Sequence, residues 1–375
     1  MSFRPFAMER WQSTWENRVR FNLSESGVHP LTAGELLALA GADADAVLSV
    51  PLGYSQSNGT EPLRSAIAAL YPGATAGNVT VTNGSAESNY AICWHLLQPG
   101  DRVALMLPNY MQTWGLAHAF EADIRPFQLR EGLGWQPDPD EVTAAIGRGT
   151  KLVVVTNPNN PTGAVLGAAA MRHIGERAEA VGAWILADEV YQGAERIGPP
   201  TPSFWGTTDH VIVVNGLSKA YGLPGLRLGW CVAPPALAAA MWSRKDYTTI
   251  GPGAMSDALA TIALVPHVRE RILDRTRGII RANWEILAAW YATMDGEFTS
   301  RPPDAGAISY ARYRTAVNSF ALADRLRREH DVLVVPGDQF EMDHYIRFGF
   351  GPPQADLEAA LERVADAFRD PPPPR

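Results

Sequence analysis

One lysine of this 375-residue chain has few charged neighbours. Lys219 lies in the stretch NGLSKAYGLPGLRLGW, residues 215–230, between the strand-like HVIVV and the apolar GLRLGWCV. The one other charged residue of that stretch is Arg227. An amine in such surroundings suits imine formation with a carbonyl compound, and a bound cationic ligand together with partial burial is expected to lower its pKa. The alternative is a lysine at a strand end with no chemical role.

An acidic pair follows another apolar run. In ILADEVYQG, residues 185–193, Asp188 and Glu189 come directly after a strand-like segment, and Tyr191 follows the aspartate by three positions. An acid at the carboxyl end of a parallel strand points into the crevice where such sheets bind ligands. Helix capping is the alternative role for an acid at this position.

Two loops add further polar groups. In TNPNNPTG, residues 156–163, a strand leads into two Asn-Pro steps that include Asn160. A plain tight loop is the alternative, because Asn and Pro are common loop builders. In TVTNGSAESNY, residues 80–90, a strand ends at a Gly-Ser turn before a helix. The free N–H groups at that helix start favour a phosphate, although every strand–helix unit has such an end.

The elements that carry these groups indicate an α/β fold. From about Asn78 to Val232, nearly continuous apolar runs such as TKLVVVT and HVIVV alternate with helical patterns. Such runs are typical of strands covered on both faces, so we expect a mainly parallel sheet with crossover helices. A long helical pattern, further strands and a last helix from about Gln354 then predict a second, α+β domain.

One ligand satisfies all of these groups. It needs a phosphate for the turn at residues 84–86 and for Arg227, an aldehyde for Lys219 and an aromatic nitrogen for Asp188. It also needs a phenolic oxygen for the Asn160 and Tyr191 side chains. Pyridoxal 5′-phosphate (PLP) has all four groups, and the sequence therefore predicts PLP as the cofactor.

The motifs also resemble those of a known family. SKAYGLPGLRLG and NPNNPTG, in this order around DEVY, are similar to motifs of fold-type I PLP enzymes of the class I/II aminotransferase family. The resemblance runs from about Asn22 to Phe368. It implies an aspartate aminotransferase-like fold: a large α/β domain with a mainly parallel, seven-stranded-type sheet between helices, plus a smaller α+β domain. The expected boundaries are an N-terminal segment at 1–45, a PLP-binding domain at 46–266 and a C-terminal domain at 267–375.

The resemblance also implies catalytic roles. Lys219 matches the lysine that forms a Schiff base with the cofactor and then moves the substrate proton. Asp188 matches the acid that keeps the pyridine nitrogen protonated, and Tyr191 and Asn160 match the residues that hold its phenolic oxygen. Tyr110, in LPNYMQTW, falls where the family stacks an aromatic ring on the cofactor, with core packing as the alternative.

The phosphate site implied by the resemblance departs from the family at one position. Arg227 and the amides of residues 84–86 match the phosphate cup, where a bidentate guanidinium suits a dianion. The family usually has a serine three residues before the lysine, where this chain has Gly216, and Ser218 is the candidate replacement. The expected cofactor-binding residues are Tyr54, Gly84, Ser85, Ala86, Tyr110, Asn160, Asp188, Tyr191, Ser218, Lys219 and Arg227.

Substrate and subunit contacts follow from the same resemblance. Arg347, in DHYIRFGFG, matches the arginine that binds the substrate α-carboxylate, with help from Asn160. Tyr54, in LGYSQSNGTEPLR, matches the tyrosine that reaches the phosphate of the neighbouring subunit, which implies a homodimer with a shared site. An arginine at a strand edge and an ordinary loop tyrosine are the alternatives.

The loop Asn22–Thr32 differs from the Gly-rich loop of typical relatives. In NLSESGVHPLT, Glu25, Ser26 and Gly27 either face the substrate, with Gly27 as the candidate contact, or lie in a solvated loop. The loop is faintly similar to one in the capreomycidine-synthase branch, whose members eliminate and cyclise arginine-derived substrates. Arg244 lies roughly where dicarboxylate-specific relatives bind a distal carboxylate, but a surface arginine is favoured.

Composition limits the alternatives. The net charge of −8 and the pI near 5.5, with no block of Lys or Arg, argue against a nucleic-acid partner. No window contains the roughly 18 apolar residues of a membrane span, and two cysteines without metal-ligand spacing suit a reducing, cytoplasmic compartment. No metal site is expected.

The leading hypothesis is an aminotransferase that moves the amino group of an L-amino acid to a 2-oxo acid. The alternative is elimination, replacement or cyclisation of an amino acid with the same cofactor, because the motifs are shared between these reactions. A PLP-sensing regulator would need a fused DNA-binding domain, for which the residues before Asn22 are too few. A nicotinamide dehydrogenase is disfavoured, since no strand leads into G-x-G-x-x-G.

Overall fold

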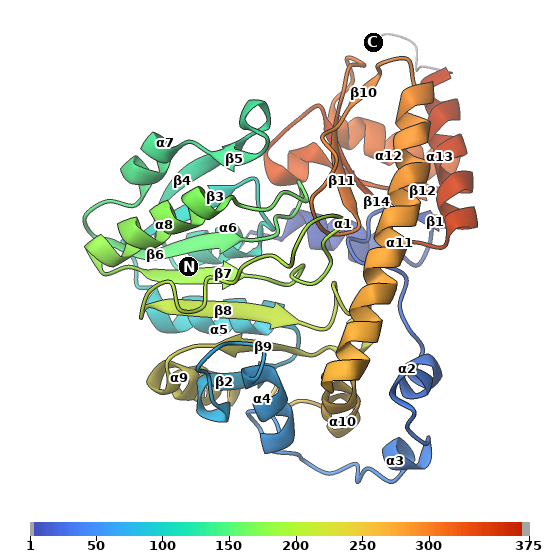
Figure 1. Ribbon diagram of the computed structural model, residues 1–375. Helices are drawn as coiled ribbons and strands as arrows, with labels where there is room; N and C mark the ends of the chain where they lie inside the picture. Colours follow the sequence, from blue (N-terminus) through green and yellow to red (C-terminus); the bar gives the residue numbers. More distant parts are fainter. Residues whose placement is uncertain (1–3, 370–375) are drawn as a thin grey trace.

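A large sheet organises the first two thirds of the chain (Figure 1). The computed structural model describes residues 4–369, and within them this sheet has eight strands. In spatial order they are β2 (Val79–Thr82), β9 (Gly229–Val232), β8 (Val211–Gly216), β7 (Trp184–Asp188), β6 (Thr150–Thr156), β3 (Arg102–Leu107), β4 (Asp123–Arg130) and β5 (Gln136–Pro137).

The sheet is parallel in its centre. Strands β8, β7, β6, β3 and β4 pair in parallel, whereas β9 pairs antiparallel with both β8 and β2, and the two-residue β5 pairs antiparallel with β4. Strand β8 is buried along its whole length, and β6 and β7 are buried except near their starts, as expected for Val- and Ile-rich strands covered on both faces. The predicted α/β fold class is confirmed, with β5 as a short addition to seven longer strands.

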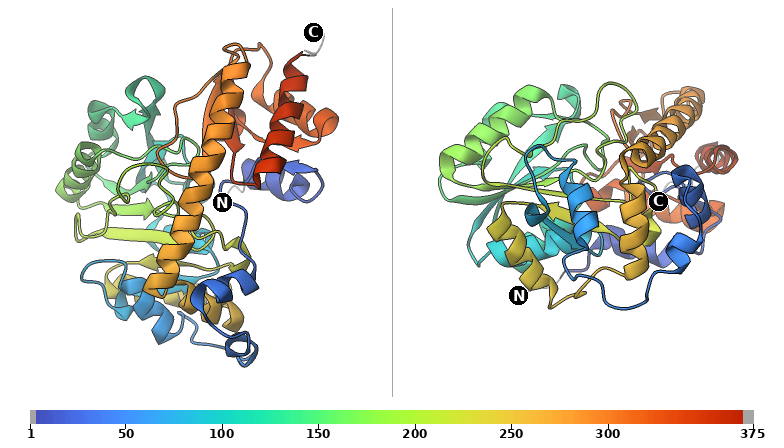
Figure 2. Two further views of the ribbon diagram at one scale, coloured as in Figure 1. Left: turned by 45° about the vertical axis from the view of Figure 1, so that its right-hand side comes forward. Right: turned by 60° about the horizontal axis from the view of Figure 1, so that its bottom comes forward.

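Helices cover both faces of this sheet (Figure 2). Helices α7 and α8 pack against each other, and α5 packs against α6 and α9. The N-terminus of α5 follows Gly84, which has a positive φ of 76°. The helices of this part are α4 (Glu61–Ala68), α5 (Ser85–Leu96), α6 (Gln112–Ala119), α7 (Pro139–Ala145), α8 (Ala168–Val181), α9 (Pro235–Lys245) and α10 (Ala254–Ala263).

A smaller antiparallel sheet lies in the C-terminal part. Its spatial order is β10 (Phe298–Thr299), β11 (Ile308–Tyr313), β14 (Tyr345–Gly349) and β13 (Val335–Pro336). The long helix α11 (Pro266–Thr293) runs along one side of the molecule, from α10 at its start to the small sheet at its end (Figure 1). Helices α12 (Ser319–His330) and α13 (Gln354–Arg369) pack against each other beside the small sheet.

The N-terminal segment joins this C-terminal part. Strand β1 (Phe21–Asn22) pairs in parallel with β12 (Val332–Leu333). Helix α1 (Ala7–Trp15) lies before β1, and α2 (Ala33–Ala40) and α3 (Asp45–Leu48) follow it. Helix α2 starts with a capping box in which Thr32 and Glu35 bond each other's backbone N–H groups. The domain boundaries at 45 and 266 stay a prediction.

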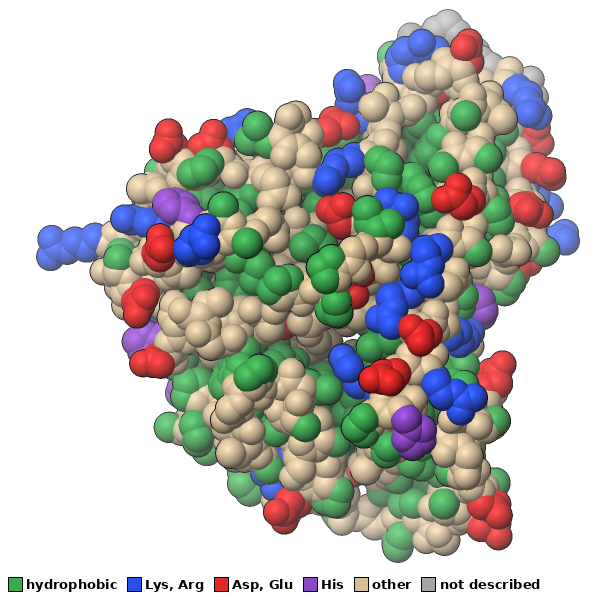
Figure 3. Space-filling model, in the orientation of Figure 1, with side chains coloured by type: hydrophobic (Ala, Val, Ile, Leu, Met, Phe, Trp, Pro, Cys, Tyr) green, Lys and Arg blue, Asp and Glu red, His purple; other side chains and the backbone are tan. Residues whose placement is uncertain are grey.

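Further features concern the helices, the surface charges and the two cysteines of the protein. Within residues 4–369, no helix is both long enough and apolar enough to cross a membrane. Acidic and basic side chains are interspersed on the face drawn in Figure 3. Cys93 and Cys231 are buried free thiols, and burial raises the pKa of each to about 12.

Candidate active site

A cavity of about 470 Å³ opens at the carboxyl ends of the central strands. It brings together most of the residues that the sequence motifs singled out. Those that line it are Ser85, Ala86, Tyr110, Asn160, Asp188, Tyr191, Ser218, Lys219, Arg227 and Arg347.

The fold explains this convergence. Asp188 is the last residue of β7, and the chain reaches Lys219 three residues after β8 ends at Gly216. Because neighbouring parallel strands end at the same edge, their loops meet there. Arg347 comes from β14 of the small sheet, so the cavity is built from both sheets.

Asp188 is a buried carboxyl group without a cationic partner. It is 6% exposed, its Oδ1 accepts the Val190 N–H at 3.2 Å, and no ion pair to it is found among residues 4–369. Burial raises its pKa to about 6, against the lowering effects of the Val190 N–H, the Asn89 side chain and, least of the three, the charge of Lys219. A protonated ring nitrogen would supply the missing cation, and this is what PLP offers.

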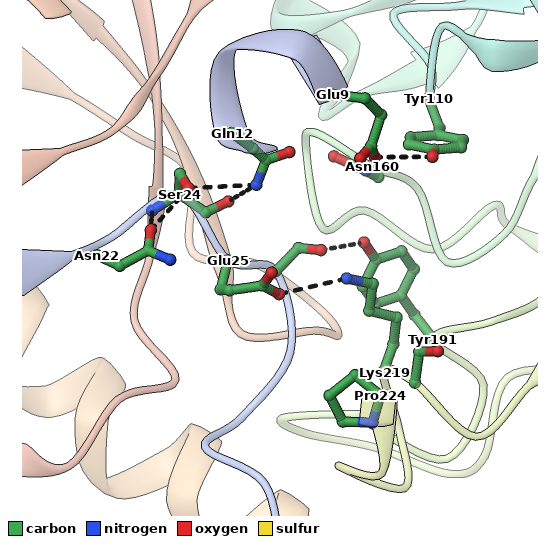
Figure 4. A network of polar contacts seen from close by, with 12 residues as sticks. Glu9, Gln12, Asn22, Ser24, Glu25, Tyr110, Asn160, Tyr191, Lys219 and Pro224 are labelled. Carbon is green, nitrogen blue, oxygen red and sulfur yellow. Dashed lines mark hydrogen bonds and ion pairs between the residues drawn. The ribbon is translucent and has the colours of Figure 1, made fainter. Parts of the chain in front are cut away.

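Lys219 is paired with a residue of the N-terminal loop. Its Nζ lies 3.5 Å from Oε2 of Glu25 (Figure 4). Burial lowers the pKa of Lys219, but Glu25 and then Tyr191 raise it, and the net direction is upward. The expectation of a lowered pKa concerns the lysine beside a bound cationic cofactor and stays a prediction, whereas in the protein alone the carboxylate of Glu25 outweighs burial in the net direction. Gly27 lies against the same lysine, since a Cβ there would be 3.7 Å from the Lys219 Cα.

Arg227 and the start of α5 form a cradle for an anion. Arg227 has a left-handed backbone with φ 47°, and its Nη1 lies 3.0 Å from the Pro224 carbonyl oxygen and 3.5 Å from the Ser218 hydroxyl. A Cβ on Gly84 would lie 2.6 Å from the Arg227 Nη2, so a larger residue there would push the guanidinium away from its present position at the helix start. Gly216 is also confined, since a Cβ there would lie 3.1 Å from the Leu228 carbonyl oxygen.

Arg347 offers an unused donor inside the protein. The residue is 1% exposed; its Nη1 donates to Asn160 Oδ1 at 2.8 Å, and its Nη2 donates to the Ser24 carbonyl oxygen. Its Nε has no hydrogen-bond partner. A buried guanidinium that is incompletely bonded is suited to a carboxylate ligand.

Two tyrosines line the cavity, and each donates a hydrogen bond to the N-terminal part of the chain. The Tyr110 hydroxyl donates to Glu9 Oε1 at 2.8 Å, and the ring meets the edge of Phe6 with centroids 5.1 Å apart. The Tyr191 hydroxyl donates to Ser26 Oγ at 2.8 Å. Figure 4 shows Tyr110, Tyr191 and Lys219 turned toward a common space below α1.

Sequence reasoning missed the contribution of α1. This helix and its flanks line the cavity with Phe6, Met8, Glu9, Gln12 and Glu16. The available signal was the buried apolar pair Met8 and Trp11 at helical spacing, which indicates an amphipathic helix with a packed face. Glu25 and Ser26 also line the cavity, so this part of the Asn22–Thr32 loop faces the site.

Other candidates lie outside the cavity lining. Tyr54 is 96% exposed and is not among the residues that line the cavity. Arg244 lies over the Trp94 ring at 5.8 Å and likewise does not line it. Gly27 and Gly84 adjoin the cavity through their contacts with Lys219 and Arg227.

Comparisons with known proteins agree with this geometry. A family model described as aminotransferase class I and II matches residues 47–364. The chain is 33% identical to capreomycidine synthase of Streptomyces vinaceus over 364 residues, which is 96% of this chain and 92% of that protein.

Two solved structures are similar to this protein over nearly its whole length. A PLP-dependent aminotransferase from Streptococcus suis superimposes with a TM-score of 0.93 and 32% identity, covering 98% of both chains. A PLP-dependent cyclase, OrfR, superimposes with a TM-score of 0.89 and 29% identity, again over 98% of both chains. With the buried acid, the anion cradle and the lysine in one cavity, these matches make the chain a PLP-dependent enzyme of the class I and II aminotransferase family.

Proposed function

We propose that the protein transfers the amino group of an L-amino acid to a 2-oxo acid. One observation carries this proposal: Arg347, buried with an unpartnered Nε, and Lys219 line the same cavity. An α-amino acid needs both, because its carboxylate requires a fixed cation and its α-carbon requires a base.

Two residues of the cavity take part in the chemistry of the proposed reaction. Bound PLP supplies a pyridine ring that accepts the electron pair left when the α C–H bond breaks. Lys219 forms the covalent link, and as the free amine it takes the α proton and returns it. Asp188 keeps the ring nitrogen protonated, so that the ring stays electron-withdrawing.

The other residues hold the cofactor and substrate in place. Arg227, Ser218 and the start of α5 bind the phosphate, where the helix dipole and the guanidinium act together. Asn160 and Tyr191 bind the phenolic oxygen, and Tyr110 packs on the ring. Arg347 fixes the α-carboxylate, which places the α-carbon near Lys219.

Single-turnover experiments test the reaction type. PLP-loaded protein is mixed with one L-amino acid at a time, without a 2-oxo acid, and the products are separated by chromatography. Transamination gives one equivalent of pyridoxamine phosphate and one of the matching 2-oxo acid, and added pyruvate then restores PLP. The Lys219→Ala variant is the control. Release of ammonia with PLP unchanged would contradict the proposal.

A lyase or cyclase reaction is the second candidate. The similarity to capreomycidine synthase and to the cyclase OrfR favours it, because both comparisons cover nearly the whole chain. In the same experiment, this function predicts ammonia or a cyclised amino acid, with no pyridoxamine phosphate.

We also propose a homodimer whose partner completes the site. An exposed apolar surface, formed by Leu48, Leu52, Tyr54, Tyr247 and Ile250, has side chains between 51% and 96% exposed. Its two segments lie side by side, since the Ser55 hydroxyl lies 3.4 Å from the Pro252 carbonyl oxygen. Large exposed apolar side chains in one region are typical of protein interfaces. Light scattering of the purified protein measures its mass in solution and is expected to give that of a dimer. A monomer at micromolar concentration would contradict the proposed homodimer.

A further inference from the structure

Helix α5 carries a buried amide, Asn89, one turn beyond the residues that form the anion cradle. Asn89 is 1% exposed and lies four residues after Ser85, so the two side chains share the face of α5 that meets the cavity. Asparagine is a poor residue for a helix interior, and a buried amide costs free energy unless its polar atoms are hydrogen-bonded. The hydrogen-bond partners of Asn89 therefore indicate its role.

A chain of hydrogen bonds fixes the orientation of the Asn89 amide. It begins at the Ala86 carbonyl oxygen, which can only accept, so the Gln112 atom that lies 2.9 Å away must be the amide nitrogen Nε2. The Oε1 of Gln112 then faces Asn89, whose Nδ2 donates to it at 3.1 Å. Because these assignments start from a backbone carbonyl, Asn89 presents its NH2 group to Gln112, and not its oxygen.

The Asn89 side chain also reaches Asp188. It stabilises the charged carboxylate by a hydrogen bond and so lowers the pKa of Asp188, second among the lowering effects to the Val190 N–H. That N–H lies 3.2 Å from the Asp188 Oδ1 and comes from only two residues further along the same segment. Asn89 therefore ties the carboxylate to a different element of the fold.

The oxygen of the Asn89 amide is left unpaired. Within residues 4–369, its Oδ1 has no hydrogen-bond partner. A buried amide that serves packing alone is expected to pair its oxygen as well as its nitrogen. An engaged NH2 group beside an unpaired oxygen indicates a side chain that is held as a donor, and an ionised carboxylate is an acceptor only. The arrangement therefore matches the charged form of Asp188.

We propose that Asn89 is a positioning residue, oriented by Gln112 and the Ala86 carbonyl, that holds the Asp188 carboxylate ionised against the ring nitrogen of PLP. This inference rests on the role proposed for Asp188. Asn89 does not itself line the cavity, so it acts through that carboxylate. One helix then serves both ends of the cofactor, because the N–H groups at its start bind the phosphate and its second turn orients the acid.

The protonation of the ring nitrogen tests this role. Protein loaded with PLP that carries ¹⁵N in the ring is measured by solid-state NMR, in which the nitrogen signal separates protonated from unprotonated rings. Asn89→Leu removes the donor with little change in volume, so the ratio of protonated to unprotonated nitrogen is expected to fall about tenfold. Ser88→Ala is the control, because Ser88 is as buried in α5 as Asn89 but its hydroxyl pairs with that of Thr82 at 2.7 Å.

Cofactor-free protein gives a second measurement. In Asn89→Leu the pKa of Asp188 should rise above its value of about 6, because an effect that lowers this pKa is removed. The folded state should then keep losing stability to higher pH, since stability is lost as the pH rises from the unfolded to the folded pKa. Thermal unfolding across a range of pH should show this extension in Asn89→Leu, but not once Asp188→Asn is added.

Two results would overturn the positioning role. One is an unchanged nitrogen ratio in Asn89→Leu, and the other is an equal fall in the Ser88→Ala control. If Asn89→Leu does not fold, Gln112→Leu decides, because it frees the Asn89 amide from its anchor. The ratio should then fall severalfold in Gln112→Leu, and an unchanged ratio would overturn the proposal.

The remaining outcomes separate the role of Asn89 from the proposed reaction. If Asp188→Asn itself leaves the nitrogen ratio unchanged, the roles of Asp188 and Asn89 are both wrong. If the ratio falls in Asn89→Leu as expected but no amino acid yields pyridoxamine phosphate, Asn89 keeps its role and transamination is wrong.

Discussion

The Oε2 of Glu25 lies 3.5 Å from the Nζ of Lys219, and this contact joins the N-terminal loop to the reactive lysine. The two side chains are 50% and 26% exposed, so solvent screens the pair in part. Without cofactor, the carboxylate holds the amine in its charged form. If Lys219 forms the proposed link to the cofactor, Glu25 would lose this cationic partner.

Glu25→Gln is expected to lower the pKa of Lys219. Burial, the largest effect on this pKa, favours the neutral amine, and Glu25 is the largest of the effects that oppose burial, so removal of its charge lowers the pKa. Competitive acetylation of cofactor-free protein, followed by mass spectrometry of the Lys219 peptide, gives the pH midpoint of its reactivity. The midpoint should lie at lower pH than in the wild-type protein. It should also lie below that of Glu358→Gln, a control that removes an exposed glutamate of α13. An unmoved midpoint would show that the pair has no influence on the amine.

Asp188→Asn is expected to stabilise the cofactor-free protein while weakening the holoenzyme. The pKa of Asp188 is about 6 in the folded protein against 3.8 for a free side chain. The folded state therefore loses stability as the pH rises through this window, by up to about 3 kcal/mol. Thermal unfolding without PLP should show the variant more stable at pH 8, with the gain vanishing near pH 4.

In the holoenzyme, Asp188→Asn is expected to impair function, although it stabilises the cofactor-free protein. With PLP bound, the Asn variant lacks the charge that keeps the ring nitrogen protonated. Exchange of the substrate α hydrogen in deuterated water, followed by NMR, should fall by about a thousandfold or more. Exchange at the wild-type rate would remove Asp188 from the mechanism.

Gly84→Ala is expected to weaken PLP binding through Arg227. The added Cβ would lie 2.6 Å from the Arg227 Nη2, so the guanidinium must shift away from its present position at the helix start. Gly73→Ala is a matched control, because Gly73 has a φ of 77°, close to the 76° of Gly84, and has no atom within 4 Å of the added Cβ. Fluorescence titration should give a loss of PLP affinity of about tenfold or more for Gly84→Ala alone. Equal losses in both variants would mean that backbone strain, not the phosphate site, is responsible.

The sequence motifs predicted the residues that line this site at the strand ends, but not those that helix α1 contributes. Asp188 and Lys219 come at or after the ends of neighbouring parallel strands, which lie at one edge of the sheet, so their meeting follows from local patterns. Arg227 precedes the antiparallel β9, whose start lies at that same edge because Gly229 is paired with Gly216. The position of α1 depends on tertiary packing: the Trp11 indole N–H donates to the Val334 carbonyl oxygen, 323 residues away in sequence. No local pattern specifies such a contact.

The position of Glu25 likewise depends on contacts with residues far away in the sequence. Sequence reasoning left Glu25, Ser26 and Gly27 open between a substrate contact and a solvated loop. The pairing of β1 with β12 and the close approach of Gly349 to the Glu25 carbonyl oxygen place this loop at the cavity. Both contacts are with residues more than 300 positions along the chain.

Subunit complementation tests whether Tyr54 acts across an interface. Tyr54 is 96% exposed and lines no part of the cavity in its own chain, so Tyr54→Ala should leave the fold and thermal stability of a single chain unchanged. If its hydroxyl reaches the partner's phosphate, the variant should bind PLP more weakly. Lys219→Ala should lack a borohydride-reducible cofactor adduct and should be inactive.

Mixing the two variants then distinguishes a contact within one chain from a contact between chains. A hybrid dimer has one site with Lys219 from the Tyr54→Ala chain and Tyr54 from the Lys219→Ala chain, and one site that lacks both. After unfolding and refolding of an equal mixture, half of the dimers are hybrids, so about a quarter of all sites are intact. Titration of the borohydride-reducible PLP adduct should then show a tight-binding class of about this size, absent from either variant alone. If mixing yields no such class, Tyr54 does not act across the interface, because only exchange of subunits brings the two intact residues into one site.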